Sequence, residues 1–530
     1  MAGIGVRLNR IFKQNTLTSN IIGFGYSIIV TIAPMLLVIG TIVITQYFLG
    51  VSKLGYASRE LFAATVLYIF IFSLLVVSPF SAVLSKYMSD IIYEEAWEDI
   101  MPCYYVGLIF AVILGVLLGV PFCLWEYFVG QVELYYVFAG FGGYMTLILI
   151  FYTMLFLLIC KDYSRVSLFF FAGMLLMFLL SLVLVYLFHW DISFAMLVSL
   201  DAGFLLIAAL ETSLVKSYFR QNSGRYKRVL HYFRQYWKLV FTNFLYVLGL
   251  YIHNFVFWTT SMRMIVVKSF VMMQPYDMAT CLAMFTNISA SVIFIVRVEM
   301  NFHQRYRAYS EMVIGGRGMD IENAKNRMFR QLGEELHNLV RIQFIVSVVI
   351  FFIAIIVLPM FGFGGLVMRI YPCLAAGYFI LFIMYSAIIF LYYYSDLTGA
   401  LLTAFTFCFI TFLGSVFSSR MMPDTWYGLG LVIGAFAGWG MSYIRLRWVE
   451  KHLDVHIFCN GNILKRGSGK KPSSKVFDRY QKQREIEEER PSGPVIIPVA
   501  ARAEDDAAEA AEEIILVDEL VKIDESAPVV

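Results

Sequence analysis

Twelve stretches of about twenty mostly apolar residues fill the first 445 positions of this 530-residue chain. A helix rises about 1.5 Å per residue, so each stretch is long enough to cross a hydrocarbon core about 30 Å thick. Hydrophobic residues make up 60% of the sequence, which excludes an ordinary soluble globular protein. We predict an all-α polytopic membrane protein with spans at 21–49, 61–84, 101–124, 135–160, 166–188, 192–214, 239–259, 276–296, 340–360, 374–394, 398–416 and 427–444.

Charged residues are distributed unevenly between the loops, and this predicts the orientation. With the N-terminus inside, the inside loops at 215–238 and 297–339 are rich in Lys and Arg, whereas the opposite loops hold few. This positive-inside pattern predicts that both termini lie in the cytoplasm. The first apolar run is too long for a signal peptide, so we expect an uncleaved anchor. The loop after the second span is acidic, with Asp90, Glu94 and Asp99, but acidic residues count little for orientation.

The basic segment at 215–238 divides the spans into two sets of six. After a cytoplasmic N-terminus at 1–20, we expect a first six-helix bundle over 21–214 and a second over 239–444. Two such bundles can enclose a space that opens to either side of the membrane. The tail at 445–530 ends in an acidic run, a composition typical of disorder.

The longest loop, at 297–339, contains apolar residues at helical spacing among charged ones. Phe329, Leu332, Leu336 and Leu339 recur in this way. One interpretation is an amphipathic helix that lies on the membrane before the ninth span. The other is a docking surface for a cytoplasmic partner, and the sequence favours neither.

Motifs for catalysis and nucleotide hydrolysis are absent from the sequence. The segment KRGSGKKP lacks the first glycine of a phosphate loop, and Lys471 stands where that motif has Ser or Thr. The seven cysteines show no CxxC pairing, and the net charge of +3 is too small to indicate nucleic acid. We therefore expect a protein that is not an enzyme and has no cofactor, no metal and no nucleic-acid partner.

Ionisable residues inside a span are informative, because each costs free energy unless it faces protein or water. Asp201 lies near the middle of the sixth span, where it can bind a proton or a cation or line a path. The alternative is a hydrogen-bonded packing residue. Glu211 lies near the inner end of the same span, where solvation at the membrane interface is a sufficient explanation. Asp396 lies in a tight turn between two spans, which is explanation enough for a polar residue.

Two further spans carry polar stripes at helical spacing. Uncharged donors and acceptors along a path suit a hydroxyl-rich substrate such as a sugar, whereas the alternative for each residue is hydrogen bonding between helices. We predict a transport path lined by side chains of three spans: Asp201, Asn243, Tyr246, His253, Asp277, Thr280, Asn287 and Ser291.

Proline and glycine positions indicate a hinge and a close helix contact. Pro34 removes a backbone donor in the middle of the first span, which predicts a hinge there. Gly430, Gly434 and Gly438 repeat every four residues in the twelfth span and allow another helix to approach closely.

Three segments carry a family resemblance. The opening MAGIGVRLNRIF, the stretch GFGYSIIVTIAPMLLVIG of the first span and SDIIYEEAWEDIMP after the second span resemble the Pel exopolysaccharide transporter family. The similarity runs over residues 1–455. It implies a twelve-helix fold of the multidrug/oligosaccharidyl-lipid/polysaccharide flippase superfamily and export of a growing amino-sugar polymer across the bacterial cytoplasmic membrane. It also implies two partners: a cytoplasmic glycosyltransferase and a membrane receptor for cyclic di-GMP.

The leading hypothesis is therefore exopolysaccharide export together with a cytoplasmic synthase. A flippase for a lipid-linked oligosaccharide is an alternative, which the scarcity of Lys and Arg inside the spans disfavours. A second alternative is a cation-coupled multidrug exporter, with Asp201 as the coupling acid. A third is a membrane scaffold that recruits a synthase and transports nothing.

Overall fold

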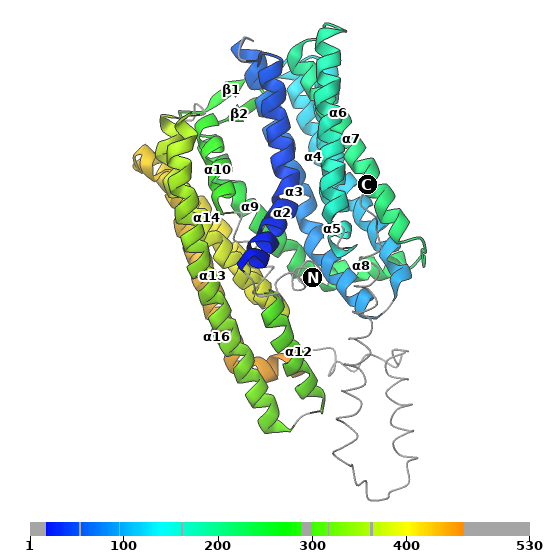
Figure 1. Ribbon diagram of the computed structural model, residues 1–530, viewed down its shortest axis with the longest axis vertical. Helices are drawn as coiled ribbons and strands as arrows, with labels where there is room; N and C mark the ends of the chain where they lie inside the picture. The colour runs from blue at the N-terminus through cyan, green and yellow to red at the C-terminus, as the bar shows by residue number, and fades with distance from the viewer. Residues whose placement is uncertain are drawn as a thin grey trace, which may run out of the picture. The chain divides into compact units, whose positions relative to one another are not determined.

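The computed structural model describes residues 17–51, 55–94, 96–160, 163–287, 299–315, 317–360 and 364–460 (Figure 1). Within these residues, ten helices are long and apolar enough to cross a membrane. Two more match predicted spans: α2 (Leu17–Phe48), with a shorter apolar stretch at Ala33–Phe48, and α10 (Gln274–Asn287). The prediction of a helical, multi-pass membrane protein is confirmed.

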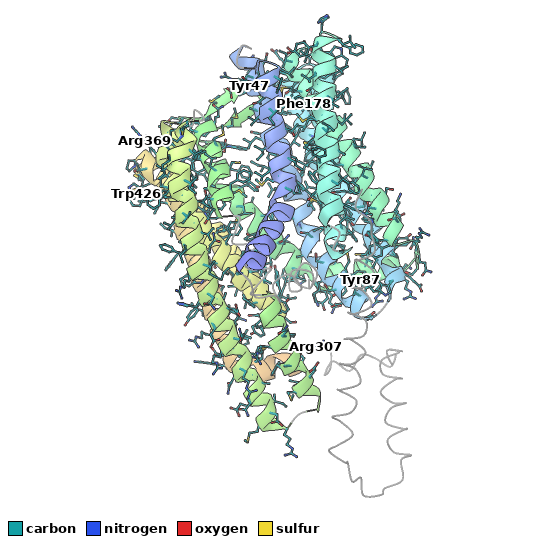
Figure 2. All side chains as sticks on the ribbon, viewed as in Figure 1. Tyr47, Tyr87, Phe178, Arg307, Arg369 and Trp426 are labelled. Carbon is teal, nitrogen blue, oxygen red and sulfur yellow. The ribbon has the colours of Figure 1, made fainter. Side chains whose placement is uncertain are left out.

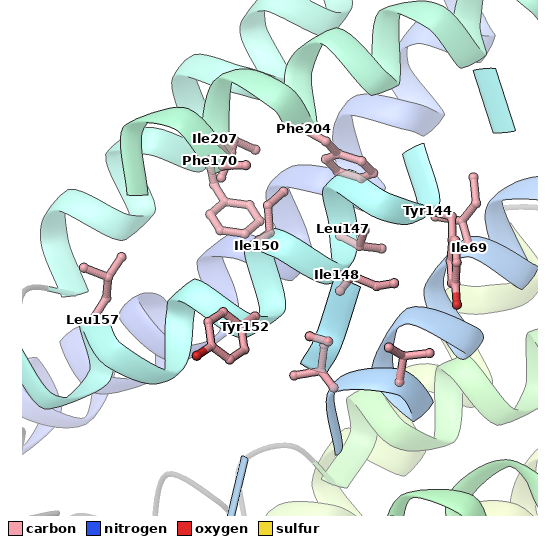
Figure 3. Packing of buried hydrophobic residues seen from close by; sticks show 14 of the residues in the cluster. Ile69, Tyr144, Leu147, Ile148, Ile150, Tyr152, Leu157, Phe170, Phe204 and Ile207 are labelled. Atoms are coloured by element: carbon pink, nitrogen blue, oxygen red, sulfur yellow. The ribbon is translucent and has the colours of Figure 1, made fainter. Parts of the chain in front are cut away.

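The first bundle is built from α2 and five further helices that pack on one another. These are α3 (Tyr56–Tyr93), α4 (Ile100–Phe128), α5 (Leu134–Cys160), α6 (Tyr163–Tyr186) and α7 (Ile192–Tyr218), with a short 3₁₀ helix η2 (Trp97–Asp99) before α4. Helix α5 packs against α3, α4 and α7, and α6 packs between α2 and α7. Their buried side chains form one apolar core, in which Leu147 and Ile148 of α5 lie beside Phe204 of α7 (Figure 3).

The second bundle has its own apolar core. Its helices are α9 (Trp237–Phe257), α10, α13 (Gly318–Met360), α14 (Leu366–Tyr393), α15 (Leu397–Met421) and α16 (Leu429–Asn460), with the short η4 (Asp424–Trp426) before α16. Helix α14 packs against α10, α13 and α16, and α15 packs against α9 and α16. Tyr378 of α14 and Phe407 of α15 are fully buried in this core. Helix α16 continues to Asn460, beyond the expected end at 444.

The bundles meet where α3 packs along α9. At one end of this contact the linker helix α8 (Tyr226–Gln235) connects α7 to α9 and packs on α3 and α4. We call this the α8 end; Tyr87 lies toward it, whereas Tyr47 lies toward the other end of the first bundle (Figure 2).

A β-hairpin lies at the opposite end, which we call the hairpin end. Strands β1 (Met264–Val266) and β2 (Phe270–Met272) pair antiparallel and pack on α3 (Figure 1). The turn places Val267 and Lys268 at φ of +48° and +58°. Turns of this kind usually contain Asn-Gly, which is missing here, so the sequence offered no hairpin signal. Among the described residues, this strand pair departs from the predicted all-α fold.

Helix α13 contradicts one of the two interpretations of the loop before the ninth span, the separate amphipathic helix. It is one unbroken helix of 43 residues, about 65 Å long and so about twice the hydrocarbon thickness. Its first half packs beside α12 (Glu299–Gly315), and the pair buries Tyr309 of α12 and Leu332 of α13 (Figure 1). The apolar stripe of the loop thus packs within a helical hairpin, and the docking surface for a cytoplasmic partner stays a prediction.

The glycine prediction for the twelfth span is confirmed. A Cβ on Gly430 would overlap Ser415 of α15, and one on Gly434 would overlap Thr411. Helices α15 and α16 therefore approach closely along this stripe. Helix α2 continues through Pro34, and the hinge at this residue stays a prediction.

Candidate functional site

Asp201 lies on α7 inside the first bundle, against the glycines of α5. A Cβ on Gly143 would overlap its Oδ1 atom, and a Cβ on Gly142 would lie 3.4 Å from its Oδ2 atom. The residue is half-buried, and Oδ1 has no hydrogen-bond partner in the described part of the chain. A buried polar group normally finds a partner, so hydrogen bonding within the protein does not account for this oxygen of Asp201.

Polar residues of α3 and α5 are close to this position. Thr65 Oγ1 of α3 lies 3.2 Å from the hydroxyl of Tyr136 on α5, and it also donates to the carbonyl of Leu61. A Cβ on Gly143 would lie 3.3 Å from Ile69 of α3, so α3, α5 and α7 converge near Asp201. Sequence reasoning missed Thr65 and Tyr136, because a single hydroxyl in a span is not distinctive.

The structure contradicts the interfacial solvation expected for Glu211. The residue has no exposed surface, and neither carboxylate oxygen has a hydrogen-bond partner among the described residues. Its neighbour Thr212 lies 3.5 Å from the hydroxyl of Tyr104, so the start of α4 covers this end of α7. Sequence reasoning could not foresee that cover, because it comes from a helix more than a hundred residues away.

Two more buried carboxylates of the first bundle were missed. Glu60 of α3 and Glu126 of α4 are 1% and 4% exposed. Glu60 pairs with Arg59 at 3.1 Å, and its Oε2 atom has no partner among the described residues. Both residues lie just outside the predicted spans, and the helices extend past those limits. Their position within two residues of a predicted span end was the sequence signal that could have identified them as buried carboxylates.

His253 lies at the hairpin end of α9 and is fully buried in the second bundle. Its Nδ1 atom shares a hydrogen bond of 2.9 Å with the hydroxyl of Tyr276 on α10. Its Nε2 atom lies 3.5 Å from the hydroxyl of Tyr378 on α14. The imidazole therefore connects three helices.

Asp277, in the first turn of α10, accepts hydrogen bonds from three groups. Asn254 donates at 2.6 Å, the Trp258 indole at 3.0 Å and the backbone amide of Met273 at 3.1 Å. Asn254 also donates to the Thr280 hydroxyl at 3.4 Å. Unlike Asp201, this carboxylate has its hydrogen-bonding capacity met by protein.

Asn287 is fully buried and joins α10, α13 and α14. Its amide donates to the carbonyl of Ala375 at 3.0 Å, and its Oδ1 atom accepts from Ser347 at 2.7 Å and Gln343 at 3.4 Å. Sequence reasoning missed Gln343 and Ser347, although their spacing of one helical turn places both on the same face of α13. Ser291, the last residue of the predicted stripe, lies outside the described residues.

Asn243 and Tyr246 lie on α9 but have different neighbours. Asn243 donates to the carbonyl of Ser78 at 2.6 Å and to the hydroxyl of Ser81 at 2.7 Å, both on α3. It thereby joins the two bundles. Tyr246 stacks on Tyr385 of α14, with ring centroids 4.6 Å apart, and so faces the second bundle.

The β-hairpin provides a second connection between the bundles. The Tyr68 hydroxyl on α3 donates to the carbonyl of Val271 at 2.8 Å and accepts from its amide at 3.1 Å. The Tyr68 ring stacks on Trp258, which in turn donates to Asp277. Residues at the hairpin end of the second bundle are thus tied to α3.

The acidic end of α3 and the loop that follows it pair with the basic linker at the α8 end. Asp99 is fully buried and accepts from Arg228 at 2.9 Å and from Arg225 at 3.3 Å. The Tyr232 hydroxyl donates to Asp90, and burial together with this hydrogen bond raises the pKa of the phenol. The acidic loop, which departed from the charge pattern of the inside loops, therefore fixes α8 in place.

Asp396 has a larger role than the turn expected for it. It is 2% exposed, pairs with Arg445 of α16 at 2.8 Å and accepts from the amide of Gly399. It caps α15 and connects it to α16. In the described residues, no group of three or more His, Cys, Asp or Glu side chains is placed to hold a metal ion.

Solved structures with a similar fold are transporters. A multidrug resistance transporter of the MATE family, in the MOP superfamily, matches in its inward-facing and its outward-facing conformation, each with a TM-score of 0.53. The identities are 12% and 13%, and the matches cover 80% and 81% of this chain and 96% of the transporter. A MOP-superfamily transporter from Pyrococcus furiosus matches with a TM-score of 0.51 at 13% identity, over 81% of this chain and 96% of that one. These identities show a shared fold.

The sequence itself identifies the family. No individually curated protein matches it at a significant level. Residues 1–458 match the PelG family, which is described as the exopolysaccharide exporter EPS-E. Because this match spans most of the chain and agrees with the two-bundle transporter fold, the protein belongs to the PelG family of exopolysaccharide exporters.

Proposed function

We propose that this protein exports a growing amino-sugar polymer of the Pel type across the bacterial cytoplasmic membrane. The observation that carries the proposal is the family match over residues 1–458, on a fold shared with MOP-superfamily transporters. In that fold two bundles meet along a limited contact, here α3 on α9, and can open toward either side.

The proposed path follows the polar groups predicted from the sequence. Asp201 is its strongest member, because one of its oxygens has no partner among the described residues. Asn243 lies at the contact between the bundles. The remaining members are Tyr246, His253, Asp277, Thr280, Asn287 and Ser291. Those in hydrogen-bonded clusters would shape the path by holding α9, α10 and α14 together.

The proposal includes a cytoplasmic glycosyltransferase that delivers the polymer and a membrane subunit that binds cyclic di-GMP. Both follow from the family. The basic loops at 215–238 and 297–339 support an orientation with the α8 end and both termini in the cytoplasm. The hairpin of α12 and the long α13 would then extend from the membrane on the side where the synthase works.

The test measures secreted and cell-retained polymer in a deletion strain whose synthase stays active. Wild-type protein should restore secretion, whereas Asp201→Asn at equal protein level should reduce it at least about tenfold, the effect of losing about 1.4 kcal/mol of stabilisation at the limiting step. Glu133→Gln, an exposed carboxylate at the start of α5, is the matched control and should secrete normally. Unchanged secretion on deletion would refute export.

A second candidate is a cation-coupled multidrug exporter. The observations that favour it are the fold shared with multidrug MATE transporters and the unpartnered oxygen of Asp201. Drug-resistance profiles of the same strains separate the two. Increased drug sensitivity on deletion, with normal polymer secretion, would select the drug exporter.

A further inference from the structure

The linker between the bundles carries a concentrated positive charge. Seven Lys and Arg residues and no acidic residue lie between positions 216 and 238: Lys216, Arg220, Arg225, Lys227, Arg228, Arg234 and Lys238. The apolar helices on either side, both long enough to cross a membrane, end at Tyr218 and begin at Trp237, so α8 directly connects two candidate spans.

One face of α8 is anchored to the protein. Val229 is 1% exposed, Arg228 pairs with Asp99 and Glu94, and the Tyr232 hydroxyl donates to Asp90. These contacts fix the rotation of the helix about its own axis.

The opposite face is exposed and cationic. Lys227, Leu230, His231 and Arg234 follow one another at helical spacing and are all exposed. Arg220, in the loop before α8, is also exposed. Because the inner face is held by ion pairs and apolar burial, Lys227 and Arg234 stay on the exposed side of α8.

Aromatic side chains flank this exposed face. Tyr218, Tyr226 and Trp237 are 44%, 40% and 49% exposed. Such half-exposed Tyr and Trp residues at the ends of spans are typical of the headgroup region of a bilayer. This composition matches the one expected beside lipid phosphates.

We propose that the exposed face of α8, with Lys227 and Arg234, binds the headgroups of anionic phospholipids together with Arg220 of the loop before it. Clusters of four to eight Lys or Arg beside a span are typical of such sites. The acidic segment 504–525 of this chain has a complementary charge. The lipid is favoured because exposed Tyr, Trp and Leu side chains accompany the cations, and these suit a bilayer interface rather than a polyanion.

The site has a consequence for the linker. Arg228 and Tyr232 hold the same short helix to the acidic loop, and α8 connects the two bundles. Anionic lipid on the exposed face of α8 would therefore hold the linker on the side opposite to these contacts. The inference does not depend on what the protein transports.

The experiment compares the full-length protein in nanodiscs of phosphatidylcholine with and without phosphatidylglycerol. Phosphatidylglycerol retained by the purified protein is measured by mass spectrometry. We expect enrichment of this lipid around wild type, and an affinity about a hundredfold lower for a triple variant, at about fivefold per cation. The triple variant is Arg220→Gln, Lys227→Gln and Arg234→Gln, which leaves the ion pairs of Asp99 intact.

The matched control neutralises three exposed cations at the hairpin end: Arg263, Lys268 and Arg369, each changed to Gln. It should retain the enrichment. In wild type, added salt should weaken retention, because exposed charges are screened. No enrichment in wild type, or equal loss in the control, would overturn the proposal. So would enrichment that occurs only after the acidic residues of 504–525 are changed to amides, because the tail would then be the occupant.

Discussion

Two carboxylates of the first bundle differ from two of the second in how the protein accommodates them. In the first bundle, Asp201 and Glu211 have oxygens without partners among the described residues. In the second, Asp277 accepts from three donors and Asp396 pairs with Arg445. Because a buried carboxylate without a partner costs free energy, the first bundle retains groups that do not stabilise it. The buried acids of this protein therefore fall into two kinds: those whose oxygens accept hydrogen bonds from the protein, and those with an oxygen that accepts none among the described residues.

The largest effect should follow the loss of Asp277. Asp277→Leu leaves the Asn254 amide, the Trp258 indole and the Met273 amide without their acceptor, and we expect a loss of about 3–5 kcal/mol in unfolding free energy. Denaturant unfolding of the purified protein in detergent measures it. Asp320→Leu, at an exposed position of α13, is the control and should change stability little. A loss below 1 kcal/mol would remove the contrast between the bundles.

A smaller effect is expected from a methyl group beside Asp201. Gly143→Ala places a Cβ against Oδ1, which should cost about 1–3 kcal/mol and displace the carboxylate. Polymer secretion should fall with it, as in Asp201→Asn. Gly440→Ala, where a Cβ meets nothing within 4 Å, should instead leave stability unchanged or raise it slightly. Normal secretion by the Gly143 variant would argue against a role for the carboxylate.

The contact between the bundles provides an intermediate case. Asn243→Ala removes hydrogen bonds to the Ser78 carbonyl and the Ser81 hydroxyl, and we expect a loss of about 1–2 kcal/mol. Gln235→Ala, at an exposed position at the end of α8, should be silent. Thermal denaturation compares the two. If both variants match wild type, Asn243 contributes nothing to joining α3 and α9.

The smallest effect on stability is expected at Glu211. Glu211→Gln removes a carboxylate that has no partner, so unfolding free energy should change by less than about 1 kcal/mol. The same denaturant assay applies, with Asp277→Asn as the contrasting variant of equal chemistry. A loss above 2 kcal/mol at Glu211 would mean that this carboxylate is hydrogen-bonded, and the two bundles would then treat their acids alike.

Much of the fold was predictable from the sequence. The apolar spans, the placement of Asp201 inside the first bundle and the close contact at Gly430 and Gly434 follow from hydropathy, length and spacing along one helix. The family resemblance rested on equally local segments, at the opening of the chain, in the first span and after the second, and the match over residues 1–458 confirmed it.

The partners of buried polar groups were not predictable. These partners come from residues far apart in the chain. Examples are the cover of Glu211 by the start of α4, the ion pair of Asp396 with Arg445 and the hydrogen bonds of Tyr68 with Val271. A single sequence contains no measure of such distances.

The repeated membrane spans and their division into two sets follow from the order of the residues alone, because a bilayer imposes its thickness on every apolar run. Which buried acids have partners depends on the folded molecule, since a hydrogen bond requires the packing of separate helices. The folded molecule also shows that α13 runs unbroken from the apolar stripe of the loop into the ninth span. This is possible because α12 packs along that stripe and covers its apolar side chains.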